Sequence, residues 1–196
     1  MIRINGAKLN MNSINKKVNN SRAFDKEALR VAQTKLNIAK QKLLEEFDQH
    51  PVTTEMKAGP EASNYSGSLG GYGNLFSFMG FSSGSHPTKA VRNFLQSFIS
   101  LKPTGRSRGS AKEYIIQMPS MEDFDFAKMP WESGNNWVRA VETGISGFSY
   151  YMHKAHEASR AGVGIQIDNK LRSEGSKSIV YMTKLLDKFR KRLIAK

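Results

Sequence analysis

The stretch Phe24–His50, FDKEALRVAQTKLNIAKQKLLEEFDQH, carries the clearest periodic pattern in this chain of 196 residues. Its apolar side chains recur at steps of three and four residues, which at about 100° per residue places them on one side of a helix. The helix should end near His50, because a residue that precedes a proline is disfavoured in the helical conformation. The expected buried stripe consists of Ala28, Val31, Ala32, Leu36, Ala39, Leu43 and Phe47.

A second helical pattern lies at the C-terminal end, from Ser176 to Ala195. One side of this helix is apolar and is formed by Ile179, Met182, Leu186, Phe189 and Leu193. The other side is basic and is formed by Lys177, Lys184, Lys188, Lys191 and Arg192. Because such a helix buries its apolar side and leaves its charges in water, the pattern predicts a surface helix with a basic face.

The stretch Gly70–Phe81, GGYGNLFSFMGF, sets large apolar side chains between glycines. We interpret Leu75–Phe81 as a strand that is apolar on both faces. Such a strand needs cover on both sides, either from a closed core or from another copy of the chain. The residues alone leave both sources of cover open.

The middle of the chain mixes loop, helix and strand signals. The glycines of residues 57–86 predict loops around one or two strands. Pro87 opens a short amphipathic helix that should end before Pro103. A basic loop should follow, with Lys102, Arg106, Arg108 and Lys112, and then a strand over Glu113–Met118.

Later signals are weaker. Residues 121–137 are acidic, aromatic and interrupted by proline, and residues 138–145 indicate either a short helix or an extended segment. Residues 148–152 fit a strand or the start of a helix, and periodicity does not decide between them. Residues 162–167 alternate between apolar and small or polar side chains, which predicts a strand.

Together these elements predict an α+β fold, with a small antiparallel sheet packed by the long N-terminal helix and the C-terminal helix. Glycine-rich loops and a short extra helix complete it. Because 39% of the residues are apolar, the chain can bury one core. We expect a flexible N-terminal arm over residues 1–22 and a single domain over residues 23–196, with an excursion at about residues 82–112.

The charge balance is strongly basic. Lys and Arg total 30 against 17 Asp and Glu, which gives a formal net charge of +13. Such an excess predicts an anionic neighbour such as nucleic acid, a membrane surface or an acidic protein. No apolar run is long enough to span a bilayer, and the first residues lack the apolar centre of a secretory signal, so a soluble chain made in the cytoplasm is expected. The absence of cysteine excludes disulfides and thiol catalysis.

Two groups of residues have the chemistry of a catalytic or metal site. His153 and His156, next to Glu157, have the spacing of two ligands on one helical face, but no third ligand is evident. Glu122, Asp123 and Asp125 form an acidic cluster of the kind used to hold metal ions, but no further acid completes it. Surface histidines and an exposed turn are the simpler interpretations, so we expect no catalytic residue, no metal site, no cofactor and no enzymatic activity.

The basic segments are a stronger signal, because contact with phosphate needs only Lys and Arg on an accessible face. Aromatic platforms of the kind that bind single strands are missing, as are recognisable helix-turn-helix or zinc-finger patterns. Reading of a specific DNA sequence is therefore not expected.

Several segments resemble virion structural proteins of tailed bacteriophages: residues 73–81, 129–134, 142–147 and 159–166, together with Trp137. More distantly, the layout resembles the neck and tail-completion proteins that include protein Z of lambda-like phages. That family has a long N-terminal helix, a small antiparallel sheet with an aromatic-x-x-x-Val-Glu-x-Gly segment, and a C-terminal helix. Trp137, Val141, Glu142 and Gly144 match the segment. The short helix after Pro87, the basic loop and the Asn-rich arm depart from the minimal family fold.

The resemblance implies a non-enzymatic protein of the virion neck, which acts as a head-to-tail connector or tail-completion ring around the DNA channel. It implies a hexameric or dodecameric ring, contacts with portal, connector or tail proteins, contact with DNA and no membrane. The expected subunit contacts are Leu75, Phe76, Phe78, Phe81, Trp131, Trp137 and Phe148. The side chains expected to face DNA or an acidic partner are Arg106, Arg108, Lys184, Lys188, Lys191 and Arg192. The alternative is a nucleic-acid-binding protein without sequence specificity, and the position on the head or tail side stays open.

Overall fold

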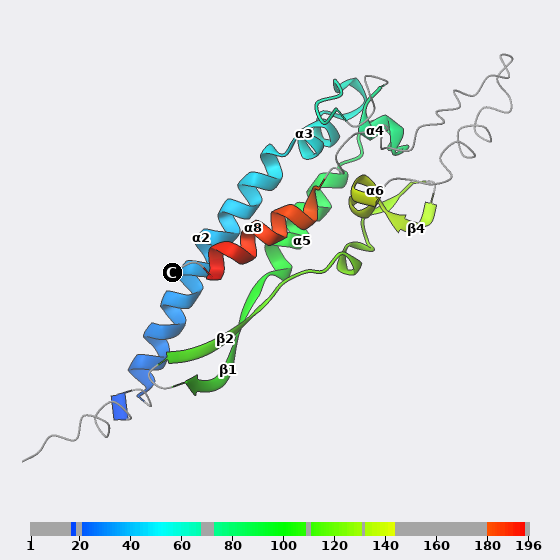
Figure 1. Ribbon diagram of the computed structural model, residues 1–196. Helices are drawn as coiled ribbons and strands as arrows, with labels where there is room; N and C mark the ends of the chain where they lie inside the picture. The colour runs from blue at the N-terminus through cyan, green and yellow to red at the C-terminus, as the bar shows by residue number, and fades with distance from the viewer. Residues whose placement is uncertain are drawn as a thin grey trace, which may run out of the picture.

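The computed structural model describes residues 17–18, 21–67, 73–108, 111–130, 132–143 and 180–194. A long N-terminal helix, α2 (Arg22–Gln49), is packed along part of its length by a C-terminal helix, α8 (Met182–Ile194) (Figure 1). Two antiparallel two-stranded sheets complete the described part of the chain. The predicted α+β class is confirmed, with a small antiparallel sheet and long N-terminal and C-terminal helices.

Helix α2 (Arg22–Gln49) confirms the long amphipathic helix. Its start is fixed by Ser21, whose hydroxyl accepts a hydrogen bond from the Phe24 backbone N–H at 3.2 Å. Its end falls where Pro51 requires it, because His50 has extended backbone angles, φ −65° and ψ 134°. A helix that the pattern did not predict, α3 (Pro51–Ala58), begins at once, with its proline in the first turn, where the missing N–H is tolerated.

The buried face of α2 is shorter than the sequence predicts. Five residues in its C-terminal half are buried: Leu36, Ala39, Leu43, Leu44 and Phe47. Val31, expected on the same stripe, is 55% exposed. The physical reason is that α8 and α5 (Pro87–Phe98) cover only part of α2. Its N-terminal turns extend past them toward the hairpin of β1 (Ser100–Arg108) and β2 (Ala111–Gln117) (Figure 1).

The strand expected over Leu75–Phe81 is wrong: Leu75–Phe78 form a short helix, α4. The Asn74 side chain accepts a hydrogen bond from the Ser77 N–H at 2.9 Å and so caps its first turn. At the other end Gly80 has φ 77°, and the Phe81 N–H donates to the Phe76 carbonyl at 3.2 Å. This is a Schellman ending, and the two phenyl rings pack at 5.7 Å between centroids.

A buried carboxylate holds α4 against α3. The Glu55 side chain is fully buried, and its two oxygens accept hydrogen bonds from the Leu75 N–H at 2.6 Å and the Ser66 N–H at 2.8 Å. Both donors belong to the segment around α4, including the first N–H of the helix itself. Glu55 therefore satisfies one donor that the start of α4 leaves without an intrahelical partner, the Leu75 N–H, and one in the turn at Ser66.

The short helix after Pro87 and the strand near residue 113 are both confirmed, as α5 (Pro87–Phe98) and β2 (Ala111–Gln117). The basic loop expected between them is not: β1 (Ser100–Arg108) covers most of it and pairs antiparallel with β2. The hairpin lies beside the N-terminal part of α2, where Lys112 pairs with Asp25 at 2.7 Å. The sequence of β1 contains Pro103 and several charged side chains and shows no alternation of apolar and polar residues. Its composition is therefore typical of a loop and does not predict a strand.

The remaining described elements are short. A 3-10 turn, η2 (Glu122–Phe124), precedes β3 (Lys128–Met129) and β4 (Glu132–Asn136), which pair antiparallel. Helix α6 (Trp137–Thr143) follows, so the helical alternative for this region is correct. The segments 148–152 and 162–167, and most of the N-terminal arm, lie outside the described residues.

The core is formed by apolar faces of α2, α3, α4, α5, α6 and α8. Tyr181, just before α8 (Met182–Ile194), lies inside it, and its hydroxyl is 2.6 Å from the Thr53 hydroxyl. Burial raises the Tyr181 pKa well above its ordinary value.

Asp48 links three helices at the rim of this core. Its carboxylate lies on α2 and forms ion pairs with Lys57 of α3 at 2.6 Å and with Arg92 of α5 at 2.9 Å. The predicted short helix after Pro87 thus contributes Val91 and Leu95 to the same core.

Candidate interaction surface

Several expected subunit contacts are core residues instead. Leu75, Phe76 and Trp137 are almost completely buried within this chain, so they offer no surface to a neighbour. Phe78 and Phe81 are partly buried and pack against the same core. Trp131 and Phe148 lie outside the described residues. Large aromatic side chains are usually buried in the core of the chain that carries them. An apolar stretch in the sequence therefore does not by itself identify a subunit interface.

The basic face of α8 is present over the described residues, although the helix begins at Met182 and not at Ser176 as predicted, and Lys177 lies outside those residues. Lys184, Lys188 and Lys191 are all exposed, and their spacing of four and three residues places them on one side of the helix. The opposite side is anchored by buried Met182, Leu185, Leu186 and Phe189. The lysines therefore project from a helix whose orientation is fixed by the core.

Arg192 ties the end of this face to α2. Its guanidinium donates to both carboxylate oxygens of Glu46, at 3.0 Å from Nη1 and 2.5 Å from Nη2. The Lys188 ammonium lies 3.8 Å from the same carboxylate. The hydrogen bond from Arg192 is the main reason that the pKa of Glu46 lies below its ordinary value. The guanidinium of Arg192 is thus already hydrogen-bonded to Glu46 within the chain, so it is less available to a partner than an exposed side chain without such a bond.

The start of α8 is held by Glu142, which lies on α6. Its carboxylate accepts hydrogen bonds from the Tyr181 N–H at 3.1 Å, the Thr183 N–H at 2.7 Å and the Thr183 hydroxyl at 2.6 Å. A carboxylate at this end of a helix also interacts favourably with the helix dipole. Three residues that the resemblance singled out therefore have structural roles here: Glu142 caps α8, and Trp137 and Val141 are buried.

His50 lies beneath the basic face, between α2 and α3. Its Nδ1 accepts a hydrogen bond from the Val52 N–H at 3.3 Å, and its ring packs on Tyr181 at 4.7 Å between centroids. Burial lowers the pKa of His50, and the positive charges of Lys184 and Lys188 lower it further. The neutral ring is therefore the form that suits the folded chain.

The other predicted basic group is separate from α8. Arg106 and Arg108 lie in the last part of β1, in the hairpin beside the N-terminal turns of α2, whereas α8 lies along the C-terminal turns (Figure 1). The positions of their side chains are outside the described part of the structure. The fold thus does not merge the two predicted basic groups into one patch on α8.

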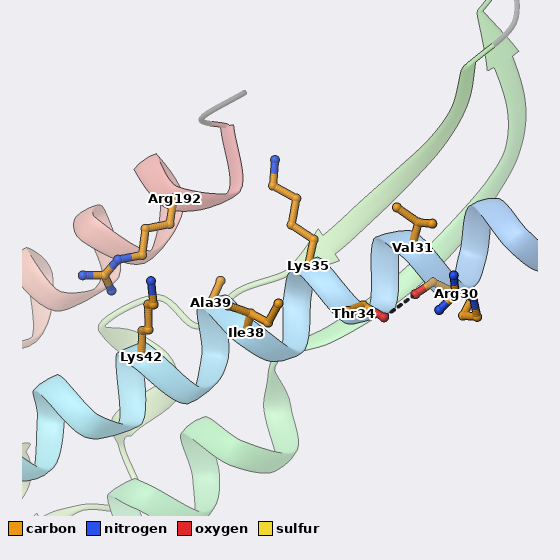
Figure 2. Close-up of a pocket in the computed structure, with 8 residues that line it drawn as sticks. All are labelled: Arg30, Val31, Thr34, Lys35, Ile38, Ala39, Lys42 and Arg192. Carbon is orange, nitrogen blue, oxygen red and sulfur yellow. Dashed lines mark hydrogen bonds between the residues drawn. The ribbon is translucent and has the colours of Figure 1, made fainter.

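An open groove of about 490 Å³ lies on α2 beyond the C-terminal end of α8. Figure 2 shows its lining: Arg30, Val31, Thr34, Lys35, Ile38, Ala39, Lys42 and Arg192. All but Arg192 come from α2. The sequence pattern missed this surface. The available signal was a second stripe at steps of four, three and four residues, formed by Val31, Lys35, Ile38 and Lys42.

The acidic cluster has local partners. Asp123 accepts hydrogen bonds from the Ser120 N–H at 2.7 Å and the Ser120 hydroxyl at 2.8 Å, and these bonds lower its pKa. Asp125 lies 3.5 Å from the Asn136 amide nitrogen. Across the described residues, no group of three or more His, Cys, Asp or Glu side chains is arranged to hold a metal ion. His153 and His156 lie outside those residues.

Comparison of the chain with protein-family models, curated proteins and solved structures finds no match in any of the three. Among the described helices, none is both long enough and apolar enough to cross a bilayer.

Proposed function

We propose that this chain is a non-enzymatic structural protein of a tailed-phage virion, and that it forms part of the neck ring around the DNA channel. The observation that carries the proposal is the exposed row of Lys184, Lys188 and Lys191 on a helix anchored in the core. The resemblance of the Trp137–Gly144 segment to neck and tail-completion proteins supports it. The proposal assigns no catalytic step, metal or cofactor to the chain.

The arrangement of α8 suits contact with a passing duplex. Lysine contacts phosphate as a point charge and reads no base sequence, so a lysine row tolerates any DNA that moves past it. Capping by Glu142 and the Glu46–Arg192 pair fix the helix at both ends, which keeps the row in one orientation. In the proposed ring, of six or twelve copies, this face would be directed toward the channel.

The proposed ring also needs subunit contacts. Because Leu75, Phe76 and Trp137 are internal, Phe78 and Phe81 are the members of the expected set, among those that the structure describes, that retain some exposed surface. Adjacent rings would be formed by portal, connector or tail proteins. The chain would reach this place in the virion after its synthesis in the host cytoplasm.

Two measurements test membership of a ring. The first is detection of the chain in purified virions of the phage that encodes it, by mass spectrometry of digested particles. The second is the native mass of the purified chain, alone and with virion components. Presence in particles together with a closed oligomer supports the proposal, whereas absence from particles contradicts it.

A free nucleic-acid-binding protein without sequence specificity is the second candidate, and the same lysine row favours it. Binding of a 20-base-pair duplex to an isolated monomer should then weaken steeply as salt rises, because released counterions dominate such binding. The variant K184E/K188E/K191E should abolish that binding, while K26E, on α2, should not. A steep salt dependence in a chain that never forms an oligomer would favour this function over the ring.

A further inference from the structure

The groove on α2 is a second candidate surface, distinct from the lysine row of α8. We infer that it binds an amphipathic helix of a partner protein, with apolar residues on one side of that helix and acidic residues flanking them. This inference goes beyond the proposed function, because it concerns a protein partner and needs neither DNA nor a ring.

The centre of the groove is apolar and exposed. Val31 is 55% exposed and Ile38 54%, both on α2, the longest of the described helices, and buried Ala39 lies beside them. Val31 and Ile38 are seven residues apart, so they lie on the same side of α2, two turns from each other. Exposed apolar side chains aligned in a groove are typical of a helix-binding surface.

The charged residues that line the groove all have one sign: Arg30, Lys35, Lys42 and Arg192. Arg30 pairs with Glu27 at 2.6 Å and Arg192 pairs with Glu46, and both of these carboxylates lie outside the lining. Within the described part of the chain, no carboxylate lines the groove itself. A ligand that fills it would therefore meet positive potential at its edges and apolar contacts at its centre.

The position of the groove indicates the shape of its occupant. Helix α8 packs along α2, and Arg192, in its last turn, forms one end of the groove (Figure 2). From Arg30 to Lys42 the surface extends for about 18 Å, the length of about three helical turns. A partner helix of this length would continue along α2 where α8 stops, and would pack on it as α8 does.

Charge decides between the occupants that have this shape. A second copy of the chain carries the same net charge of +13, and residues 1–16 contain Arg and Lys but neither Asp nor Glu. Both would add positive charge to a positive rim. A DNA duplex would place phosphates over Val31 and Ile38, which offer no hydrogen bonds, and no aromatic side chain lines the groove for a base to stack on. An acidic amphipathic helix matches both the rim and the floor.

The test uses the full chain and a fluorescein-labelled 14-residue peptide, with leucines on one helical face and glutamates beside them. One control peptide has the same composition in scrambled order, and another has lysine in place of each glutamate. Fluorescence anisotropy should show that the acidic amphipathic peptide binds at least tenfold more tightly than either control. Binding should weaken as NaCl rises from 50 to 500 mM, because its flanking charges are screened.

Paired variants locate the binding. V31S/I38S and K35E/K42E should each weaken it at least tenfold, whereas L29S and K26E, which change exposed α2 residues outside the groove, should change it less than twofold. All six substituted side chains are exposed, so the fold should persist, which circular dichroism checks. The inference is overturned by equal binding of the scrambled peptide or by unchanged binding in both groove variants. A dimer that V31S/I38S dissociates, or peptide displacement by a 20-base-pair duplex, would also overturn it in favour of a second copy or DNA.

Discussion

Glu142 shows how one side chain can place an interaction surface. It lies on α6, yet it accepts hydrogen bonds from two backbone N–H groups at the start of α8, 39 and 41 residues further along the chain. The lysines of α8 have a fixed direction partly because this carboxylate holds the helix start. Because the contact depends on how α6 and α8 pack, residue spacing did not reveal it.

Replacement of Glu142 should loosen α8. We expect E142A to lower the free energy of unfolding by about 1–2 kcal/mol, because a cap and a favourable charge at the helix start are lost. E142Q keeps an acceptor oxygen and should lose less. Urea unfolding followed by circular dichroism measures the three proteins, with the exposed Glu61→Ala as control. Equal stability of E142A and the parent protein would show that α8 is held without this cap.

His50 makes the stability of the fold sensitive to pH. Its pKa is lowered below the ordinary value of 6.5 in the folded chain, so the unfolded chain takes up the proton first as pH falls. The stability contributed by the neutral ring is complete above pH 6.5 and is lost as pH falls toward the lower pKa of the folded chain. Protonation would also remove the acceptor for the Val52 N–H and add a charge near Lys184 and Lys188.

Urea unfolding at pH 7, 6 and 5 should therefore show a decrease in stability that H50N reduces, because asparagine keeps an acceptor but does not titrate in this range. The matched control is H86N, at an exposed histidine before α5 that makes no side-chain capping hydrogen bond. It should keep the pH dependence of the parent protein. Should H50N keep that dependence in full, the source must be another group.

At the scale of elements, α4 is the clearest departure from the predicted structure. The apolar residues of Leu75–Phe81 predict a strand, but Asn74 before them is a helix cap and Gly80 near their end is a helix-ending residue. Asn74 and Gly80 therefore indicate the two ends of a short helix. The strand prediction rests instead on the number of aromatic side chains between them. In contrast, the end of α2 was predictable because Pro51 restricts His50 whatever the tertiary structure.

The helical structure of α4 gives different burial to Phe76 and Phe78, which the strand hypothesis assigned to the same kind of subunit contact. Phe76 is 1% exposed, whereas Phe78 is only partly buried. We expect F76A to lower the free energy of unfolding by about 3–5 kcal/mol, and F78A by less than half as much. Thermal or urea unfolding of the two variants gives the comparison. A larger loss in F78A would mean that the two side chains have been assigned to the wrong sides of α4.

The groove on α2 could be predicted only in part, because the stripe of Val31, Lys35, Ile38 and Lys42 does not show which of these side chains another helix covers. Val31 belongs to the apolar stripe by spacing, but it is exposed because α8 ends before reaching it. The sequence predicted both helices and their apolar faces, but not how far one extends along the other. The basic face of α8 was predictable for the opposite reason, since Lys184, Lys188 and Lys191 share one side of the helix wherever it packs.

At the scale of the whole molecule, the apolar core stabilises the folded chain, and the positive surface charge is where we propose that partners bind. The core lies between α2 and the shorter helices, so the fold does not depend on a neighbour to cover Leu75, Phe76 or Trp137. Part of the positive charge of the chain lies on the lysine row of α8 and on the rim of the groove, the two surfaces for which we propose partners. Such a protomer would be folded before it enters an assembly.

The most direct test of the proposed neck function is electron cryomicroscopy of intact virions, with the head-to-tail junction resolved to side chains. We expect a closed ring of this chain at the junction, with Lys184, Lys188 and Lys191 directed toward the DNA channel. A junction of that quality in which every ring is built from other chains, or a ring of this chain whose α8 lysines face away from the DNA, would contradict it.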